Sequence, residues 1–417
     1  MQVNSMRFLD RWAGVPISVA LTGVRKLSDL FRAAPPPAPK KILIIKLVEQ
    51  GATVIAVPAI RRAIDMVGRD NVYFAVLEEN RPILDLLDLI PAENILVIRS
   101  KSLVGVAVDT LRAIARLRRD RVDAAIDFEF FSRFSGALTY LSGASRRVGF
   151  HSYAGEAGYR GDLMTHRMAY NIRLHASETY LSLVEALTVS AKQLPMLGFA
   201  TPDTSCSAEY VPKPADVDAV RSMLKSLLPT AKPGGLLLIN ANSGDLLPIR
   251  RWPDERYVEL AQRLLKQNPD LCIALTGAPS EREGAERLAA RIGSERCASV
   301  AGHTTLPQLF ALYTLSDVMV TNDSGPAHYA ALTPIDVVTL FGPESPLVFG
   351  ARNDRSHLLW AALACSPCVN AFNQRVTTCK HGQCMQSIGV DEVFAAVSGI
   401  FEKRTASRES SRAISFA

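Results

Sequence analysis

Runs of apolar and β-branched residues alternate with amphipathic stretches over two long portions of the chain. In the first portion, the apolar runs predict strands at 41–47, 71–77, 94–98 and 124–130. Helical spacing of apolar positions predicts helices over 60–67 and 105–118 between them. Strands that alternate with helices in this way are typical of a parallel sheet with crossover helices.

The pattern starts again near Gly235, after a looser, proline-rich stretch. Strands are predicted at 235–240, 271–277, 318–322 and 335–342, with helices at 253–268, at 280–292 and from Pro326. Each of these strands ends in or runs into Gly, Asn or Asp, at the sheet edge where open α/β folds bind ligands. The sequence therefore predicts an α/β protein with two Rossmann-like halves in series.

Domain boundaries follow from these patterns. We predict an amphipathic and linker segment, a first Rossmann-like domain, a linker, a second Rossmann-like domain that carries a cysteine cluster, and a C-terminal helix and tail. Their bounds are 1–39, 40–205, 206–233, 234–390 and 391–417. Two domains suit a chain of 417 residues, because a single hydrophobic core rarely grows beyond about 300 residues.

Composition and charge narrow the function classes. Apolar residues make up 48% of the chain and charged residues 21%, as in an ordinary soluble α/β protein. The net charge of +6 is mild for this length; it favours anionic ligands, and we expect no nucleic-acid partner. No apolar run reaches about 18 residues, so we expect no membrane-spanning helix.

The N-terminal stretch lacks the order of a secretion signal, because charged residues and Pro16 interrupt its weak apolar segment. We expect instead a short amphipathic helix that lies either on a membrane or on the protein's own surface. Its apolar side would carry Phe8, Leu9, Trp12, Val15 and Leu21, opposite Arg7, Arg11, Arg25 and Lys26. Without a secretion signal, we expect a cytoplasmic protein with reduced cysteines.

The most informative segment is 316–346, SDVMVTNDSGPAHYAALTPIDVVTLFGPESP. Its first strand leads into Asp323, Ser324 and Gly325 at a helix start, where free amides and the helix dipole suit a diphosphate. Gly325 would let a phosphate approach the backbone closely, and His328 could reach a bound phosphate or sugar. Alternatively, Asp323 is an ordinary helix N-cap and His328 a packed surface residue.

This segment resembles the nucleotide-sugar motif of glycosyltransferase family 9, the heptosyltransferase family. The family motif is Asp-Thr/Ser-Gly, a small or apolar pair and His, followed later by Phe-Gly-Pro-x-x-Pro. The matching positions are Asp323, Ser324, Gly325, His328, Phe341, Gly342, Pro343 and Pro346. The similarity runs through most of the chain, from about Lys41 to about Val397.

Other donor-binding positions come from the same resemblance. Arg250 stands where the family has a phosphate-binding lysine before Trp-Pro; arginine keeps the charge and adds a bidentate fork. Asn242 and Ser243 occupy the polar loop that faces the nucleotide phosphates in the family. Glu281 matches a glutamate that holds ribose hydroxyls, or else it is a helix-start carboxylate that interacts with the dipole.

The resemblance implies a GT-B fold whose two domains face a cleft, with the acceptor bound by the first domain and the nucleotide-sugar donor by the second. Such enzymes invert the anomeric centre without a catalytic metal. The implied donor is ADP-heptose, and the implied acceptor is a lipopolysaccharide core or related surface glycan or glycolipid. The enzyme would then work peripherally at the inner face of the bacterial inner membrane. The alternatives are a nucleotide-sugar 2-epimerase or hydrolase, and a non-catalytic nucleotide-sugar-binding homologue.

One position departs from the family pattern. Lys46 matches the family's strand lysine and Gly51 the glycine of its first turn, but the catalytic aspartate falls on Ala52. An alanine cannot accept a proton from an acceptor hydroxyl. Either another carboxylate replaces the base or the usual transfer is lost.

Three nearby carboxylates could replace that base. We favour Glu129 or Asp127 at the end of the fourth strand, with Glu49 in the first turn close behind. Alternation along a strand would place Asp127 and Glu129 on one face, where like-charge repulsion can raise one pKa. Alternatively, these carboxylates only form ion pairs with Arg133, Arg146 or Arg147.

A polar stretch late in the first domain could contact the acceptor. It carries Arg160, His166, Asn171 and His175. These side chains could bind phosphate or sugar hydroxyls, and a purely structural loop is an equal alternative.

Four cysteines near the end of the second domain have metal-ligand spacing. Cys365, Cys368, Cys379 and Cys384 form a C-x2-C-x10-C-x4-C pattern. Four thiolates suggest a structural zinc or iron site, because four protein ligands leave no open position for catalysis. A reduced loop or a disulfide pair is the alternative.

Overall fold

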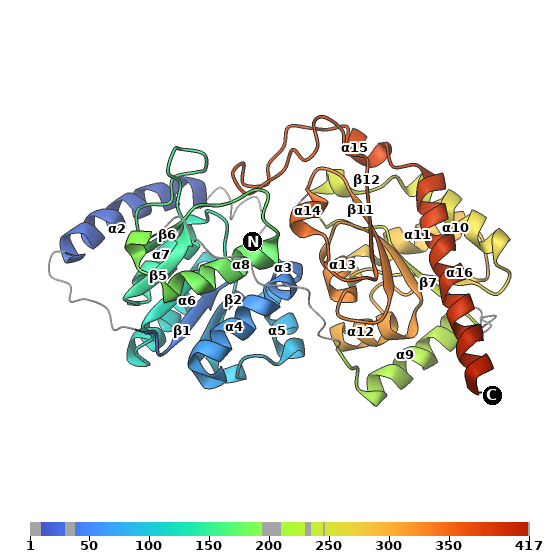
Figure 1. The fold of residues 1–417 in the computed structure, drawn as a ribbon, viewed down its shortest axis with the longest axis horizontal. Helices are drawn as coiled ribbons and strands as arrows, with labels where there is room; N and C mark the ends of the chain where they lie inside the picture. The colour runs from blue at the N-terminus through green and yellow to red at the C-terminus, as the bar shows by residue number, and fades with distance from the viewer. Residues whose placement is uncertain (1–9, 30–37, 194–209, 230–234, 245–246, 416–417) are drawn as a thin grey trace. The chain divides into compact units, whose positions relative to one another are not determined.

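The computed structural model describes residues 10–29, 38–193, 210–229, 235–244 and 247–415, with side chains of the last helix described as far as Arg404. The chain divides into two compact α/β units (Figure 1). The first contains Met1–Thr204 together with Val369–Thr377, and the second contains Ser205–Cys368 and Thr378–Ala417. The short segment 369–377 therefore belongs to the first unit, although the sequence on both sides of it belongs to the second.

The first unit is built on a six-stranded parallel sheet in the order β3-β2-β1-β4-β5-β6. Its strands are β1 (Ile42–Ile45), β2 (Val72–Leu77), β3 (Ile95–Ile98), β4 (Ala124–Asp127), β5 (Arg146–Phe150) and β6 (His166–Met168). Its helices are α2 (Gly14–Asp29), α3 (Gln50–Ile55), α4 (Val57–Val67), α5 (Arg81–Leu87), α6 (Leu103–Arg119), α7 (Arg133–Leu141) and α8 (Ala176–Glu185). Ile45 lies opposite Asp127 in the register of β1 and β4. The loops after these two strands therefore meet at one edge of the sheet.

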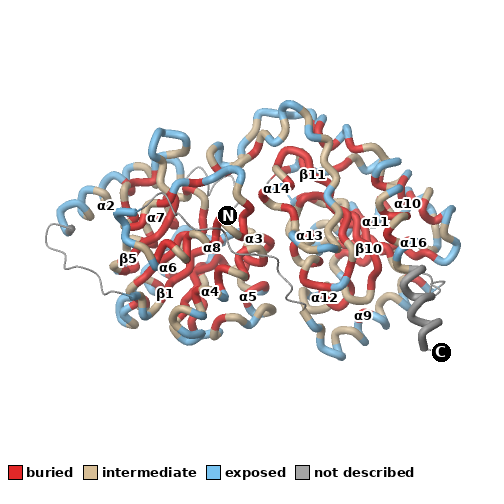
Figure 2. The backbone as a smooth tube through the Cα atoms, viewed as in Figure 1, coloured by how far each residue is buried: buried red, intermediate tan, exposed pale blue. Residues whose placement is uncertain are grey.

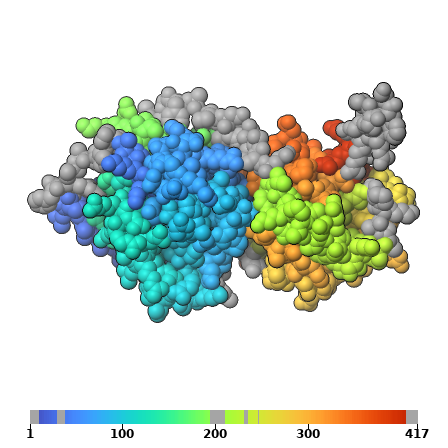
Figure 3. Space-filling view, turned by 90° about the horizontal axis from the view of Figure 1, so that it is seen from below, coloured from blue at the N-terminus to red at the C-terminus, as the bar shows by residue number. Residues whose placement is uncertain are grey.

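The second unit repeats this topology with the order β12-β11-β10-β7-β8-β9. Its strands are β7 (Leu236–Asn240), β8 (Cys272–Leu275), β9 (Cys297–Ser299), β10 (Val318–Asn322), β11 (Asp336–Phe341) and β12 (Ser356–Trp360). Its helices are α9 (Pro214–Leu227), α10 (Asp254–Gln267), α11 (Arg282–Ile292), α12 (Leu306–Leu315), α13 (Gly325–Ala330), α14 (Pro346–Phe349), α15 (Gln383–Gln386) and α16 (Val390–Ser415). Figure 3 shows α9 on the outer surface of this unit. The loops after β7, β10 and β11 meet at one sheet edge.

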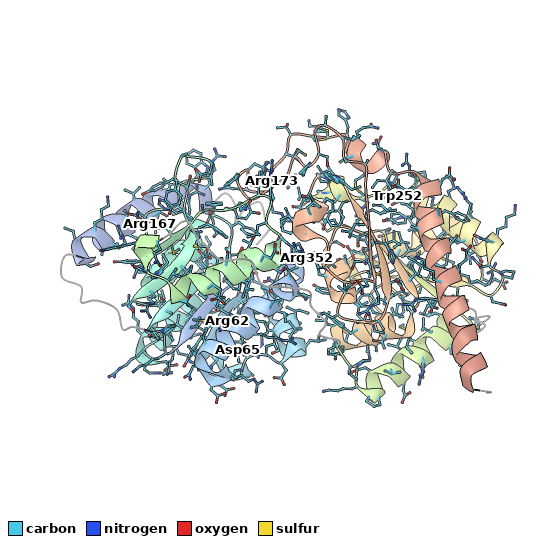
Figure 4. The ribbon with its side chains drawn as sticks, viewed as in Figure 1. Arg62, Asp65, Arg167, Arg173, Trp252 and Arg352 are labelled. Atoms are coloured by element: carbon cyan, nitrogen blue, oxygen red, sulfur yellow. The ribbon has the colours of Figure 1, made fainter. Side chains whose placement is uncertain are left out.

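Helices cover both faces of each sheet, which explains why the central strands are continuous apolar runs. In β7, Leu237 and Ile239 pack under α10, α11 and α16, whereas Leu238 packs on the opposite face under α9 and α12. The central strands are accordingly among the most deeply buried parts of the described chain (Figure 2). Trp252, labelled in Figure 4, is fully buried and meets Tyr257 edge-on, with 4.9 Å between the ring centroids.

The predicted α/β class with two Rossmann-like sheets is confirmed. The short strands β5, β6, β9 and β12 were not predicted, because none has a clear apolar run of its own. The predicted strand 124–130 was too long: β4 ends at Asp127, so Glu129 lies in the following loop. The argument that strand alternation places Asp127 and Glu129 on one face is therefore wrong. None of the described helices is long and apolar enough to cross a membrane.

Candidate functional site

Asn322, the last residue of β10, holds together the loops at the ligand edge of the second sheet. Its side-chain amide donates to the carbonyl oxygens of Ala241 and Asn242, at 3.0 and 3.2 Å. Its amide oxygen accepts from the Trp252 backbone N–H at 3.0 Å and from the Tyr257 hydroxyl at 3.1 Å. This buried residue was not predicted as part of the site, although its place at the end of an apolar strand was the available signal.

Arg250 reaches this edge from a short 3₁₀ helix, Pro248–Arg250, and is largely buried. Its guanidinium donates to the Ser243 carbonyl at 3.1 Å. It also lies 3.4 Å from a carboxylate oxygen of Glu344 and 3.6 Å from one of Asp323. The structure thus brings Asp323 and Glu344 to Arg250 and Ser243, which lie much earlier in the sequence.

Glu344 is the charged residue that sequence reasoning missed here. It occupies a variable position of the Phe-Gly-Pro-x-x-Pro motif and is almost fully buried. Burial, and next the charge of Asp323, raise the pKa of Glu344 well above its usual range, against the opposing effect of Arg250. This environment favours the protonated form of Glu344, whose carboxyl hydrogen-bonds to Asp323.

Three buried polar atoms in this cluster have no hydrogen-bond partner among the described residues. One is an acceptor, the Asp323 Oδ2, and two are donors, the Ser243 hydroxyl and the Arg250 Nε. Buried donors without partners are costly, and a ligand with phosphate oxygens would satisfy both. His328 is buried beside them, and this burial lowers the pKa of its imidazole, which leaves a neutral ring suited to a hydroxyl or phosphate oxygen.

The remaining predicted donor-binding residues lie around the same edge or hold its loops. The Asn242 backbone N–H donates to the Asn240 side chain at 3.3 Å. Ser324 is the residue before α13, and its hydroxyl donates back to the Asn322 carbonyl rather than capping the helix. An added Cβ at Gly325 would come within 3.2 Å of the Tyr329 hydroxyl. Glu281 caps its own helix start by accepting from the Ala278 N–H at 2.7 Å, as its structural interpretation predicted.

In the first unit, Lys46 directly follows β1 and is completely buried. Its ammonium lies 3.2 Å from Glu129 and 3.5 Å from Glu49. Burial lowers the pKa of Lys46, and the neighbouring Glu129 carboxylate opposes that shift. Lys46 is thus the centre of a cluster of charged side chains near the start of α3, the helix that contains Ala52.

Two of the three candidate bases are occupied by structural contacts. Besides the contact with Lys46, Glu129 accepts from the backbone N–H groups of Leu47 and Val48 at 2.6 and 3.1 Å. Asp127 is fully buried; it pairs with Arg160 and accepts from the Ser135 hydroxyl at 2.9 Å. Burial is the main cause that raises the pKa of Asp127, and Arg160 opposes it.

Glu49 differs from the other two because its side chain is partly exposed. It precedes α3 with φ 70° and ψ 85°, a left-handed conformation that is unusual for a residue other than glycine. Such backbone strain is often found at functional sites. Its carboxylate pairs with Lys46 and with Arg375, which comes from the segment Val369–Thr377. Arg375 was not predicted.

The alternative ion pairs predicted with Arg133 and Arg147 are wrong. Arg133 pairs with Asp10, and Arg147 donates to the backbone carbonyls of Leu163 and Ala144. The actual partners are Lys46, Arg160 and Arg375.

The polar stretch proposed to contact the acceptor has mainly local contacts. Arg160 is committed to Asp127, and the Nδ1 of His166 contacts the Thr165 hydroxyl at 2.9 Å. Asn171 accepts from the Arg173 backbone N–H at 2.9 Å. His175 caps α8 by accepting from the Ser177 N–H at 3.2 Å. These contacts favour the structural alternative.

The cysteine cluster does not form the predicted metal site. Cys368 and Cys379 lie near enough to Cys384 to add to the effect of burial, the main cause that raises the pKa of the Cys384 thiol. Among the described residues, however, no group of three or more His, Cys, Asp or Glu side chains is placed to hold a metal ion. A structural zinc or iron is therefore not supported. Arg7, Phe8 and Leu9 of the predicted N-terminal amphipathic helix lie outside the described residues.

Curated relatives match a limited part of the chain. It is 37% identical to lipopolysaccharide heptosyltransferase 2 of Salmonella typhimurium over 102 residues, which are 24% of this chain and 29% of the relative. It is 30% identical to lipooligosaccharide heptosyltransferase 2 of Haemophilus influenzae over 115 residues, 27% of this chain and 33% of the relative. The matched segment thus spans about a third or less of these relatives.

Solved structures match over far more of the chain. The Escherichia coli ADP-heptose lipopolysaccharide heptosyltransferase II has a TM-score of 0.63 at 19% identity, covering 88% of this chain and 99% of that one. A family 9 glycosyltransferase from Veillonella parvula has a TM-score of 0.67 at 16% identity, covering 88% and 98%. At such low sequence identity, the structural similarity shows that the chain has the GT-B fold.

The model of glycosyltransferase family 9 (heptosyltransferase) matches residues 110–377. This range is more than half of the 417 residues. It includes Arg250, Asp323, Ser324 and His328, the residues that the sequence motif assigned to the donor. The chain therefore belongs to glycosyltransferase family 9.

Proposed function

We propose that this protein is an inverting glycosyltransferase that moves a heptose-like sugar from a nucleotide-diphosphate donor to a lipopolysaccharide core or related surface glycan. ADP-heptose is the proposed donor, since solved family members include an E. coli heptosyltransferase with ADP. The observation that carries the proposal is that the Nε of the buried Arg250 and the nearby Ser243 hydroxyl have no hydrogen-bond partner among the described residues. Such a pair fits a diphosphate.

Each donor-binding residue has a role in this proposal. Arg250, Ser243 and Asn242 would hold the diphosphate, together with the backbone at Ser324 and Gly325. His328, neutral through burial, would donate to or accept from a phosphate or sugar oxygen. Asp323 would orient Arg250, and Glu281 would hold the ribose hydroxyls.

We propose Glu49 as the base that replaces the family aspartate. Glu129 and Asp127 are committed to backbone amides, Lys46 and Arg160, whereas Glu49 keeps an exposed part and lies one helical turn before Ala52. Glu49 would take the proton from the acceptor hydroxyl, whose oxygen then bonds to the anomeric carbon on the face opposite the leaving group. The bond from that carbon to the diphosphate breaks, and Arg250 stabilises the departing charge. The proposed steps need no metal.

A thermal-shift screen with ADP-, GDP- and UDP-sugars tests the donor proposal. Ligand at about 100 times its dissociation constant stabilises the folded protein by about 2.7 kcal/mol. ADP-heptose should therefore raise the melting temperature of the wild type and not that of Asp323→Ala or Arg250→Ala. If no nucleotide sugar shifts the wild type, the donor site is wrong.

The second candidate function is a nucleotide-sugar-binding protein without transfer activity, which Ala52 favours. It predicts donor binding with no transfer to any acceptor. Mass spectrometry of the donor, incubated with and without a heptose-deficient lipopolysaccharide core, separates the two functions. The same assay without acceptor also detects hydrolysis or epimerisation.

The glycolipid acceptor sets the proposed location. Transfer to a lipopolysaccharide core would occur at the cytoplasmic face of the inner membrane, with the enzyme bound peripherally. Cell fractionation with detection of the full chain tests this, and recovery outside the cytoplasm and membrane fractions would contradict it.

A further inference from the structure

The exposed side of the N-terminal helix is apolar. Five large apolar side chains in and just before α2 are exposed: Trp12 at 65%, Ile17 at 49%, Val19 at 55%, Val24 at 54% and Leu27 at 66%. Figure 2 shows α2 mainly in the colours of exposed and intermediate residues. We call these five residues the α2 apolar face. The predicted apolar side was partly wrong, because Val15 and Leu21 are half-buried against the unit.

Polar contacts hold the other side of α2 against the first unit. α2 packs on α7 (Figure 1), and Ser18 is completely buried. The Thr22 hydroxyl accepts from the Asp162 backbone N–H at 2.9 Å. Arg25 pairs at 2.7 Å with Asp162.

Asp162 also joins α2 to the sheet. Its carboxylate lies 2.8 Å from Arg167 of β6, a residue labelled in Figure 4. An added Cβ at Gly161 would come within 2.9 Å of the Ser18 carbonyl, so the helix and this loop are in close contact. Just before α2, Asp10 accepts from the backbone N–H of Phe134 at 2.9 Å.

This orientation is the reverse of that in an ordinary surface helix. Surface helices usually bury their apolar stripe and expose their polar side. Here the polar side is anchored by hydrogen bonds and ion pairs, and the apolar side faces outward. A continuous apolar patch on a folded protein commonly marks a contact surface.

The charges around this face favour an anionic partner. Arg11 and Lys26 are exposed beside the apolar face. Large apolar side chains flanked by basic residues are typical of helices that lie in the headgroup region of anionic membranes. Two copies of this chain would bring like charges together.

We propose that the α2 apolar face binds the surface of an anionic phospholipid bilayer, with the helix parallel to the membrane plane. The inference goes beyond the sugar-transfer reaction and does not depend on it. The first unit would then be the part of the protein that binds the membrane. The ion pairs of Asp162 would connect the bound helix to the sheet.

Vesicle sedimentation of the full-length chain tests this proposal. Wild type should sediment with vesicles of phosphatidylcholine and phosphatidylglycerol, and much less with phosphatidylcholine alone or at high salt. The double variant Val24→Glu/Leu27→Glu should lower the partition coefficient by about tenfold or more. Val211→Glu in the second unit is the matched control, because Val211 is 83% exposed; it should bind as the wild type does.

Tryptophan fluorescence gives a second readout. Trp12 is the exposed tryptophan of this helix region, whereas Trp252 is fully buried. Anionic vesicles should shift the wild-type emission to shorter wavelength, and Trp12→Phe should bind without that shift. Equal circular dichroism and melting temperature would show that all variants fold.

Three results would overturn the proposal. The first is a failure of the wild type to sediment with anionic vesicles. The second is vesicle binding by the double variant that is as tight as binding by Val211→Glu. The third is light scattering that finds a dimer which the double variant abolishes, with vesicle binding unchanged. Donor binding should be equal in all variants, so a failure here is distinct from a failure of the proposed sugar transfer.

Discussion

The ligand edges of the two sheets share one topology but differ in how their charged groups are used. At the edge of the second sheet, Arg250 and Ser243 keep buried donor atoms without hydrogen-bond partners among the described residues. At the edge of the first sheet, Lys46 and Glu129 satisfy each other and the adjacent backbone. The second edge thus presents two buried donors to an anion, whereas at the first edge Glu49 is the candidate base that keeps an exposed part. The difference suggests that donor binding follows the family and that proton removal has been reassigned.

Replacing the proposed base should have the largest effect on turnover. Glu49→Gln keeps the size of the side chain but cannot take a proton, so kcat should fall by about 10³-fold with the donor dissociation constant unchanged. Steady-state transfer assays measure this. In that background Ala52→Asp, which restores the family aspartate at a half-buried position, should recover part of the activity. Full activity of Glu49→Gln would exclude Glu49 as the base.

Replacing Arg250, the cationic residue of the donor site, should weaken donor binding and not only lower turnover. Arg250→Ala deletes a charged donor and should raise the donor dissociation constant by about 100-fold. Arg250→Lys should lose less, because it keeps the charge but not the planar fork. Calorimetric titration measures both. The exposed neighbour Arg251 provides the control: if Arg251→Ala weakened binding equally, the effect would be nonspecific charge loss.

Arg375 should act by positioning Glu49. Arg375→Ala removes one of its two cationic partners, so kcat should fall by about tenfold while donor affinity stays constant. Arg375→Lys should restore much of the rate, and a merely structural role would not show this split. A parallel loss of melting temperature in both variants would instead indicate a structural role for the segment 369–377.

The smallest effect concerns the pH dependence of stability. Because the pKa of Glu344 is raised, the folded state binds that proton more tightly than the unfolded chain does. The resulting stabilisation is complete below the ordinary carboxyl pKa and is lost as the pH rises through the raised value. Melting curves between about pH 5 and pH 9 should show wild type losing stability relative to Glu344→Gln. Parallel curves would contradict a raised pKa of Glu344.

The features that depend on residues close together in the sequence were predicted correctly. The strands at both sheet edges were visible as apolar runs, and Asp323 and His328 as parts of one contiguous motif. Glu344 was missed because a sequence does not show that a carboxyl is buried beside another. Arg375 was missed because no local pattern indicates that 369–377 packs in the first unit. For α2, periodicity identified an amphipathic helix but not which side would be anchored.

The most direct test compares the ADP-heptose dissociation constants of Glu49→Gln and Arg250→Ala, each measured by titration of the full-length chain. It asks whether donor binding and proton removal belong to different sheet edges. The account predicts that Glu49→Gln binds the donor within about twofold of wild type although its transfer activity is lost, and that Arg250→Ala binds about 100-fold more weakly. Equal loss of donor affinity in both variants, or wild-type affinity in Arg250→Ala, would contradict it.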